Sequence, residues 1–440
     1  MPSPSPELTA ADVETTLCPK CSSRLVTEYA SVPWCEHCEW NLDSFTPERH
    51  LGRVDRFVAR LDHNLGYKLS TSLHRQLVGK TVQRPGVSPA YFALLAISAL
   101  VMAISLGLAG LGGYLVLTWP FLMKAVGMLL IAVAVLFRPR VWSLRKLLRE
   151  VDPLTEAEAP ALFALVRRVA TAVGAPMPHR LSLNADYNAF AAVVGVTRRR
   201  VMILGLPYFT IRRPQERVAL IGHELGHFIN GDNHRSLAAQ PARIAFGTAA
   251  DLIDPAGMLQ SLRDAAQDNV FVALAIPVAL AVSPLMWAAR WLLLLTHLGV
   301  NAIGARESQR AEYYADDLAA QAAGSTAAAA DLDINLNAQG MVTVIGARAR
   351  SREGTAGWRA GVEQARAGHA DRLSRLRQWS LRREAGIFAS HPPSGLRVRM
   401  IQAAPYREPA VVLTEAESAA IDAELAKYEE RYRREIAHSW

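Results

Sequence analysis

Residues 214–231 read Pro-Gln-Glu-Arg-Val-Ala-Leu-Ile-Gly-His223-Glu224-Leu-Gly-His227-Phe-Ile-Asn-Gly. The proline suits the first turn of a helix and the final Asn-Gly pair suits its end, so the stretch is predicted to form one helix. His223 and His227 are four residues apart and share a helix face, where both imidazoles can bind one Zn²⁺. Glu224 stands beside the first ligand but off the metal, where it can take a proton from water. The pattern predicts a catalytic zinc site, and the alternative is a histidine pair with a structural role.

A zinc ion that acts on a substrate needs a third protein ligand and keeps its fourth position for water. In one known arrangement, the third zinc ligand is a histidine six residues after the second histidine, with a glycine three residues after it. Asn230 and Asn233 occupy those two places here, so this arrangement is excluded. A distant carboxylate is therefore expected, and Glu312 is the best candidate. It lies among alanines at positions 311, 315 and 319, which predicts a helix face in close contact with another element. Glu307 is the rival ligand, and the alternative for it is a surface charge.

The helix around Glu312 carries a second carboxylate, Asp316, one turn further along the same face. A histidine that binds a metal usually donates its other ring nitrogen to a carboxylate, which fixes the orientation of the ring. We therefore expect Asp316 to support one of the histidine ligands rather than to bind the metal itself.

The four cysteines of the chain fall in one short stretch, as Cys18-Pro-Lys-Cys21 and Cys35-Glu-His-Cys38. Two such pairs supply four thiolates to a tetrahedral Zn²⁺ with no open position, so residues 16–45 are predicted to form a zinc ribbon around a structural metal. The alternatives are two disulfides or a redox-active pair. The N-terminus lacks the basic and apolar segments of a signal peptide, and no βαβ pattern lies nearby, which argues against both.

Two apolar blocks account for much of the hydrophobic content of 51%. The first, residues 91–137, contains a single charge, Lys124, and is long enough for two membrane spans of about 20 residues each. We expect spans at about 91–117 and 120–137, joined by a turn near Trp119-Pro120. Together they form a predicted transmembrane hairpin within residues 89–138.

The second apolar block, residues 271–303, carries only one charge, Arg290. His227 precedes this block and Glu312 follows it, so a shared zinc requires an even number of membrane crossings between them. We expect a second hairpin over residues 270–304, with two short spans that meet near Pro284 and with Arg290 facing protein or water. The alternative is a long helix that lies in or beside the bilayer without crossing it.

The net charge of +8 is attributed to Lys and Arg residues near the membrane. A nucleic-acid partner is not expected, because the basic residues are not interleaved with aromatic residues in a recognisable motif.

Basic residues flank the first apolar block on both sides: Arg75, Lys80 and Arg84 precede it, and Arg138, Arg140, Arg145, Lys146 and Arg149 follow it. Both flanks are therefore expected to face the cytosol, together with the N-terminus, the zinc ribbon and the catalytic site.

Several motifs of the chain occur in a fixed order. The His-Glu-Leu-Gly-His sequence at 223–227 is followed by an apolar block and then by Glu312-Tyr-Tyr-Ala-Asp316. Asn188-Ala189-Phe190-Ala191 lies upstream, and His391-Pro392-Pro393 with Arg397 lies downstream. Over roughly residues 90–405, this arrangement resembles the HtpX and CAAX-prenyl-protease family of integral membrane zinc endopeptidases. The N-terminal zinc ribbon is an addition to the pattern of the best-known members.

The resemblance implies a mainly α-helical, multi-span membrane metalloprotease with a small β-sheet. It implies that His223, His227 and Glu312 bind the zinc, with Glu224 as the general base. It also implies that His391 and Arg397 lie in the cleft, where they help to bind the substrate or stabilise the tetrahedral oxyanion.

A strand upstream of the zinc helix is the implied site of substrate binding. An extended peptide would pair along residues 188–194, with Asn188, Ala189 and Phe190 as substrate-binding residues. The alternative is that this stretch is an ordinary strand of the sheet.

The predicted segments are a disordered tail (1–15), the zinc ribbon (16–45), a juxtamembrane linker (46–88), the transmembrane hairpin (89–138), the protease domain (139–408) and a charged C-terminal helix (409–440). The expected function is hydrolysis of protein substrates at the cytosolic face of a membrane, with one catalytic and one structural Zn²⁺. Membrane lipid is an expected partner, and a protein could bind through the ribbon or the C-terminal helix. The alternative function is an inactive membrane scaffold that recruits a partner through the ribbon.

Overall fold

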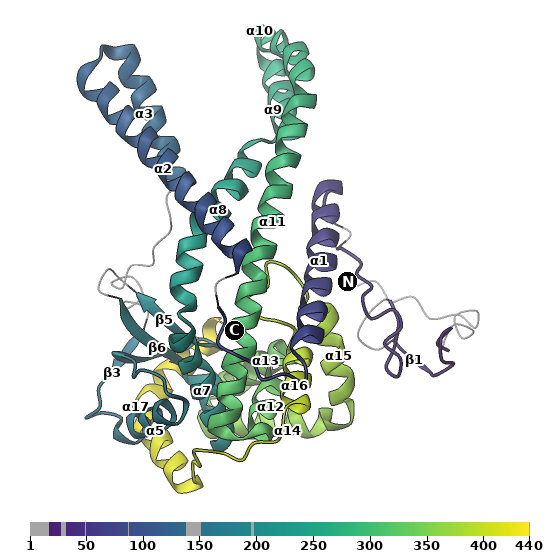
Figure 1. Ribbon diagram of the computed structural model, residues 1–440, viewed down its shortest axis with the longest axis vertical. Helices are drawn as coiled ribbons and strands as arrows, with labels where there is room; N and C mark the ends of the chain where they lie inside the picture. Colours follow the sequence, from purple (N-terminus) through teal and green to yellow (C-terminus); the bar gives the residue numbers. More distant parts are fainter. Residues whose placement is uncertain are drawn as a thin grey trace.

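The computed structural model describes residues 17–27, 32–48, 50–86, 88–137, 151–194 and 198–439, with the backbone alone at 232–238 and 270. Figure 1 shows a base of helices around a small sheet, from which long helical arms rise. The prediction of a mainly α-helical chain with a small sheet is confirmed. The predicted tail at 1–15 and the basic residues between 138 and 149 lie outside the described residues.

The larger sheet has four strands in the order β3 (Asp152–Leu154), β4 (Arg180–Asn184), β6 (Arg199–Gly205) and β5 (Ala189–Val194). Strands β4 and β6 are parallel, whereas β3 and β5 run antiparallel to their neighbours. The register of β5 pairs Ala189 with Leu204 and Val194 with Arg199. Strand β5 therefore stands at one end of the sheet, and it packs against the helix that carries both histidines.

The helix α7 (Pro214–Asn230) spans the stretch that carries both histidines. Its first turn is capped by Glu216, whose carboxylate accepts a hydrogen bond from the backbone N–H of Arg213 at 3.0 Å. It ends at Gly231, whose left-handed backbone (φ 70°) is the conformation that glycine adopts most easily after a helix. Almost every residue of α7 up to Gly226 is buried, so the helix passes through the core of the base.

A second helix, α11 (Ala275–Ala323), crosses α7 at a contact made by small residues. A β-carbon at Gly226 would lie 3.0 Å from the Cα of Ala315, and one at Gly222 would lie 3.1 Å from the Cβ of Ala322. The side chain of Asn230 donates a hydrogen bond to the carbonyl of Ala311 at 3.0 Å, which fixes the end of α7 on the same helix. The predicted close packing of the alanine face of this helix is therefore present.

The predicted hairpin at 270–304 is wrong. A short helix α10 (Val270–Ala273) leads into α11, which continues through Pro284 without a turn and carries the apolar block into the polar segment around Glu312. A proline removes only one backbone hydrogen bond, and a helix that continues on both sides satisfies the remaining backbone groups of an apolar segment.

Because His227 and Glu312 meet at one site, the chain between them must extend outward and then return. The outward segment consists of residues that the hydropathy pattern did not mark as a membrane span. The chain leaves α7 through α8 (Asp232–Leu252) and α9 (Pro255–Asp268) and returns along α11, as Figure 1 shows. Arg290 of α11 forms an ion pair with Asp254 at 2.8 Å, so this charge faces protein. This ion pair therefore links the start of α9 to α11.

The first apolar block forms α2 (Pro89–Thr118) and α3 (Phe121–Leu136), with the turn at Trp119 and Pro120. By length and composition, α2 and the segment from Phe271 to Ala323 are the candidate membrane spans of the described residues, and the 16-residue α3 is shorter. In the most apolar 18-residue stretch of each segment, only 17% is buried in α2 and only 6% in the segment from Phe271 to Ala323. The core helix of a soluble protein would be mostly buried, and these two apolar segments are not.

The remaining helices complete the base. They are α5 (Pro160–Val173), α6 (Leu206–Thr210), α12 (Ser325–Asn335), α13 (Ala338–Arg350), α14 (Thr355–His369), the 3₁₀ turn η2 (Ala370–Arg372), α15 (Leu373–Arg383), α16 (Ser394–Ala403) and α17 (Glu415–Ser439). The C-terminal helix α17 buries Ile421, Leu425, Tyr432 and Ile436 in the main core. Its apolar stripe is thus covered by the protein's own base.

The N-terminal part consists of a two-stranded sheet, β1 (Leu25–Val26) with β2 (Trp34–Cys35), followed by helix α1 (Arg53–Leu77). The segment predicted as a linker therefore contains a 25-residue helix. It packs against α11 and α16 with a narrow buried stripe that includes Gly66, Ser70 and Leu73.

We expect substitution of Gly226 by valine to destabilise the protein, because the α7–α11 contact has no room for a side chain. Overpacking of this kind typically costs about 1–3 kcal/mol. Thermal unfolding of the detergent-solubilised protein measures the effect. Gly299→Val, on the partner helix α11, is the matched control, since a β-carbon there meets nothing within 4 Å. Equal melting temperatures for the two variants would contradict the close contact.

Candidate functional site

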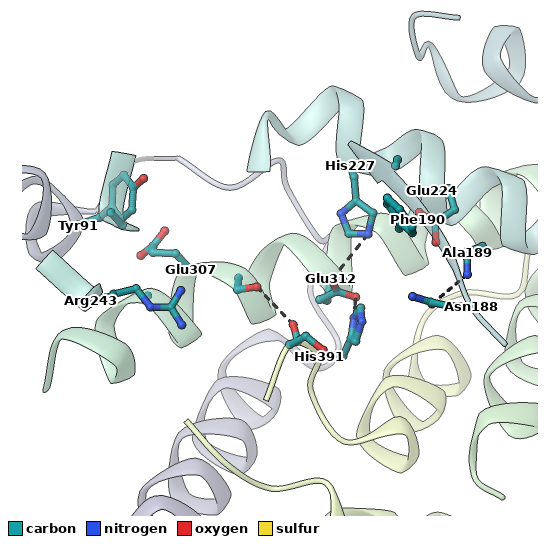
Figure 2. Close-up of a pocket in the computed structure, with 15 residues that line it drawn as sticks. Tyr91, Asn188, Ala189, Phe190, Glu224, His227, Arg243, Glu307, Glu312 and His391 are labelled. Atoms are coloured by element: carbon teal, nitrogen blue, oxygen red, sulfur yellow. Dashed lines mark hydrogen bonds and ion pairs between the residues drawn. The ribbon is translucent and has the colours of Figure 1, made fainter. Parts of the chain in front are cut away.

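The two histidines of α7 and the glutamate of α11 converge on one point. The Nε2 atoms of His223 and His227 lie 3.3 Å apart. The carboxylate oxygens of Glu312 lie 3.5 Å from His223 Nε2 and 3.7 Å from His227 Nε2. Figure 2 shows His227 and Glu312 directed toward one another from separate helices. The structure thus brings together the three side chains that the sequence analysis named as ligands.

This geometry fits a tetrahedral zinc ion. Bonds of about 2.0–2.2 Å at tetrahedral angles place neighbouring ligand atoms roughly 3.3–3.5 Å apart. Glu312 is only 4% exposed, and its two carboxylate oxygens face the Nε2 atoms of the two histidines. A buried carboxylate is expensive unless cations or donors satisfy it, and a zinc ion between these three side chains would do so.

The electrostatics of the two glutamates differ. Burial acts to raise the pKa of Glu312, but the imidazoles of His391, His227 and His223 together hold it well below its ordinary value. Glu312 is therefore a carboxylate, as a ligand must be. Burial raises the pKa of Glu224, and the neighbouring His227 and His223 offset only part of this effect. A raised pKa makes Glu224 a stronger base for proton transfer.

Asp316 supports the first ligand from behind. Its Oδ1 atom lies 3.1 Å from His223 Nδ1, the nitrogen that faces away from the metal position. Arg397 of α16 binds the same carboxylate through two nitrogens, with Nη2 at 2.6 Å from Oδ1 and Nε at 2.8 Å from Oδ2. Burial acts to raise the pKa of Asp316, but the attraction of Arg397 outweighs it and the pKa is lowered. Asp316 is therefore an anion that can hold the imidazole of His223 in one orientation.

His391 lies on the loop between α15 and α16, on the open side of the site. Its Nδ1 atom is 2.7 Å from Glu312 Oε2, and its side chain is 51% exposed. His223, Glu312 and His391 also lie close enough together to bind a metal as a group. We favour the α7 pair as ligands, because its nitrogens have the separation of two zinc ligands, whereas His391 stands at hydrogen-bond distance from Glu312.

Arg397 lies deeper than His391. It is 6% exposed, and its guanidinium is occupied by Asp316, although Nη2 also comes within 3.6 Å of Glu312. The structure therefore brings Arg397 to the site but directs its strongest contacts toward the support of a ligand.

A cleft passes the metal position on both sides. One cavity of about 280 Å³ and another of about 550 Å³ share a boundary of five residues: Asn188, Ala189, Glu224, Ser390 and His391. Strand β5 forms one wall, so Asn188, Ala189 and Phe190 do line the cleft as the resemblance implied. Sequence reasoning missed Tyr91, Arg243, Ser308 and Ser390 as lining residues, because they belong to no motif.

The four cysteines form a second cluster that fits a metal. The Sγ atoms of Cys18 and Cys38 lie 3.6 Å apart, and those of Cys21 and Cys35 lie 3.4 Å apart. Zinc–sulfur bonds of about 2.3 Å would place tetrahedral sulfurs roughly 3.7 Å apart. Hydrogen bonds from the hydroxyl and the backbone of Ser23 lower the pKa of Cys21 to about 6, which favours the thiolate that binds zinc.

The ribbon is attached to the helix that precedes the His391 loop. Trp34 donates a hydrogen bond from its indole to Gln378 of α15 at 3.0 Å, and Gln378 donates to the carbonyl of Glu36 at 2.7 Å. Arg382, also on α15, donates to the carbonyls of Leu42 and Val32 at 3.2 and 2.6 Å. The ribbon and the loop that carries His391 are therefore fixed to the same short helix.

Comparison with known families gives an independent result. The sequence profile of peptidase family M48 matches residues 156–404, which is more than half of the chain. The matched region contains α7, the zinc-facing part of α11 and the loop with His391, and it excludes the ribbon. No solved structure matches the chain.

We expect the purified protein to contain two zinc ions per chain, measured by elemental analysis. The double variant Cys21→Ser/Cys38→Ser should retain one, and His223→Ala/His227→Ala should also retain one, because each pair belongs to a different cluster. A single zinc in the wild-type protein would contradict the assignment of two sites.

Replacing Asp316 with asparagine should weaken the catalytic zinc about 10- to 100-fold, the usual effect of losing a carboxylate that supports a ligand. Zinc release to a competing chelator measures the change. Asp317→Asn is the matched control, because the neighbouring carboxylate pairs with Arg407 at 2.9 Å. If the two variants release zinc equally, Asp316 does not support the ligand.

Proposed function

Because the chain belongs to peptidase family M48, we propose that it is a zinc-dependent endopeptidase that hydrolyses peptide bonds of protein substrates. One observation carries the proposal: His223, His227 and Glu312 come from two helices to one point, and Glu224 stands beside them in a cleft. A structural histidine pair would need neither the buried third carboxylate nor the open side toward the cleft. The arrangement is that of a catalytic zinc site with three protein ligands.

Glu224 is proposed as the general base and acid. When bound to the three ligands, zinc supplies Lewis acidity to the scissile carbonyl and to the attacking water. Glu224 accepts the proton of that water as its oxygen attacks the carbonyl carbon, and then gives the proton to the departing amine. The burial that raises the pKa of Glu224 brings it closer to neutral pH, where a base of this kind is most effective.

His391 and Arg397 take different roles in this proposal. His391 is half exposed and borders both cavities, so we assign it to the stabilisation of the oxyanion that develops on the scissile carbonyl. Arg397 is buried and binds Asp316, which in turn faces His223. We therefore propose Arg397 as a positioning residue that acts on the zinc ligands through Asp316.

The substrate is proposed to bind as an extended peptide alongside β5. This strand lies at the end of the sheet and lines the cleft beside Glu224, which is the position for a chain that adds to a sheet edge. Asn188, Ala189 and Phe190 are then contacts for the residues next to the scissile bond.

The protein is proposed to be a multi-pass membrane protein with its active site and N-terminus in the cytosol. The arms α2–α3 and α8–α11 cross the bilayer in this proposal, and the apolar faces of α2 and of the upper part of α11 support it. Basic residues such as Arg75, Lys80 and Arg84 precede the first arm on the side of the base. No observation favours the alternative of an inactive scaffold, since a complete set of ligands and a base line the cleft.

We expect Glu224→Gln to retain both zinc ions and to lose at least about 99% of peptide cleavage, because the amide cannot accept the proton. Cleavage of casein, followed by mass spectrometry, and elemental analysis measure the two properties together. Glu435→Gln on the exposed face of α17 is the matched control and should cleave like the wild type. Normal cleavage by Glu224→Gln would show that another residue is the base.

A further inference from the structure

One cavity of the cleft contains a carboxylate that the proposed mechanism does not use. The 280 Å³ cavity extends from Glu224 and His227 to a far end lined by Tyr91 of α2, Arg243 of α8 and Glu307 of α11. Figure 2 shows these three side chains gathered apart from Glu312 and His391. We call this far end the Glu307 pocket.

Glu307 is neither a zinc ligand nor a surface charge. It is 6% exposed, and it does not belong to the metal-binding group around Glu312. Its Oε2 atom is buried and has no hydrogen-bond partner among the described residues, and no Lys, Arg or His nitrogen described in the structure lies within 4.0 Å of the carboxylate. A buried carboxylate without a partner among the described residues is costly, so this position suits a cation or a strong donor that enters the cavity.

Arg243 does not supply that cation. Its Nε atom donates a hydrogen bond to Oδ1 of Asn301 on α11 at 2.7 Å. No ion pair joins Arg243 to a carboxylate within the described part of the chain, so it borders the pocket as a separate charge. The pocket is thus a built site, with one acidic side chain held open toward the cavity.

The position of Glu307 relates it to the scissile bond. It precedes the ligand Glu312 by five residues on the same helix, a rise of about 7.5 Å. An extended peptide advances about 3.3 Å per residue, so a substrate alongside β5 would bring a side chain to this pocket about two residues from the cleaved bond. A lysine or arginine side chain has the length and the charge to fill the cavity.

We propose that Glu307 determines specificity by binding a basic side chain of the peptide substrate, about two residues from the scissile bond. The inference rests on the proposed peptidase function and adds to it the class of sequence that is cleaved. Charge-assisted hydrogen bonds to a buried carboxylate are among the stronger polar contacts, so the selection should be roughly 10- to 100-fold in kcat/KM.

The test uses the full-length protein in detergent and a peptide library prepared from a proteome by cleavage after acidic residues, so that lysine and arginine remain inside the peptides. Mass spectrometry identifies the cleavage sites that depend on Glu224. Wild-type protein should show enrichment of lysine or arginine at one position within three residues of the bond. Glu307→Gln should lose that enrichment, whereas Arg243→Gln should keep or increase it. Glu435→Gln is the control and should keep the wild-type profile.

A single peptide from the library gives the magnitude. Its basic residue is replaced by norleucine, and the ratio of kcat/KM for the two peptides should fall from at least about tenfold to about one in Glu307→Gln. Thermal unfolding of Glu307→Gln should match that of the wild type, because Glu307 Oε2 has no hydrogen-bond partner among the described residues.

The outcomes separate the two proposals. Cleavage that depends on Glu224 but shows no basic preference, or a preference that survives Glu307→Gln, overturns the role of Glu307 and leaves the peptidase function intact. Selection of acidic residues that is lost in Arg243→Gln overturns it as well, in favour of Arg243. The absence of any cleavage that depends on Glu224 overturns the peptidase function and this inference with it.

Discussion

The crossing of α7 and α11 determines the rest of the structure. The two histidines and the glutamate are separated by an apolar arm in the sequence, and they meet only because the helix backbones approach closely at Gly222 and Gly226. A larger side chain at this crossing would push the helices apart by more than the tolerance of a zinc site, whose ligand distances vary by only about 0.2 Å. The small residues of both helices thus bring the three candidate ligands together and also let the core pack closely.

The contacts behind the metal position extend this constraint into the base. Asp316 holds His223, Arg397 holds Asp316, and α16 holds Arg397 against α15 through a hydrogen bond from Gly395 to Ser380 at 2.8 Å. The zinc ribbon is fixed to α15 from its other side. The cysteine cluster of the N-terminus therefore lies at the end of a continuous series of packed elements that leads to the candidate site, and none of the cysteines lines the cleft.

The sequence predicted the parts of the site that depend on spacing. Short-range structure alone produces three of these geometries. They are the four-residue spacing of the two histidines, the alanine face around Glu312 and the turn within each CxxC pair. The second membrane arm was not predictable in this way. Hydropathy marks the apolar residues of α11, but the outward arm through α8 and α9 contains charges such as Arg243 and Asp254 that are accommodated only by tertiary contacts. The burial of Glu307 was hidden for the same reason, since a helix sequence does not reveal which of its charged residues face a cavity.

The central claim is that one metal ion is held jointly by α7 and α11. Anomalous X-ray scattering at the zinc edge, measured on crystals of the full-length protein, tests it most directly. The account predicts a peak about 2.0–2.2 Å from the Nε2 atoms of His223 and His227 and from a carboxylate oxygen of Glu312, in addition to the peak among the four cysteines. A peak at the cysteines alone, or a second peak bound by His391 without His227, would contradict it.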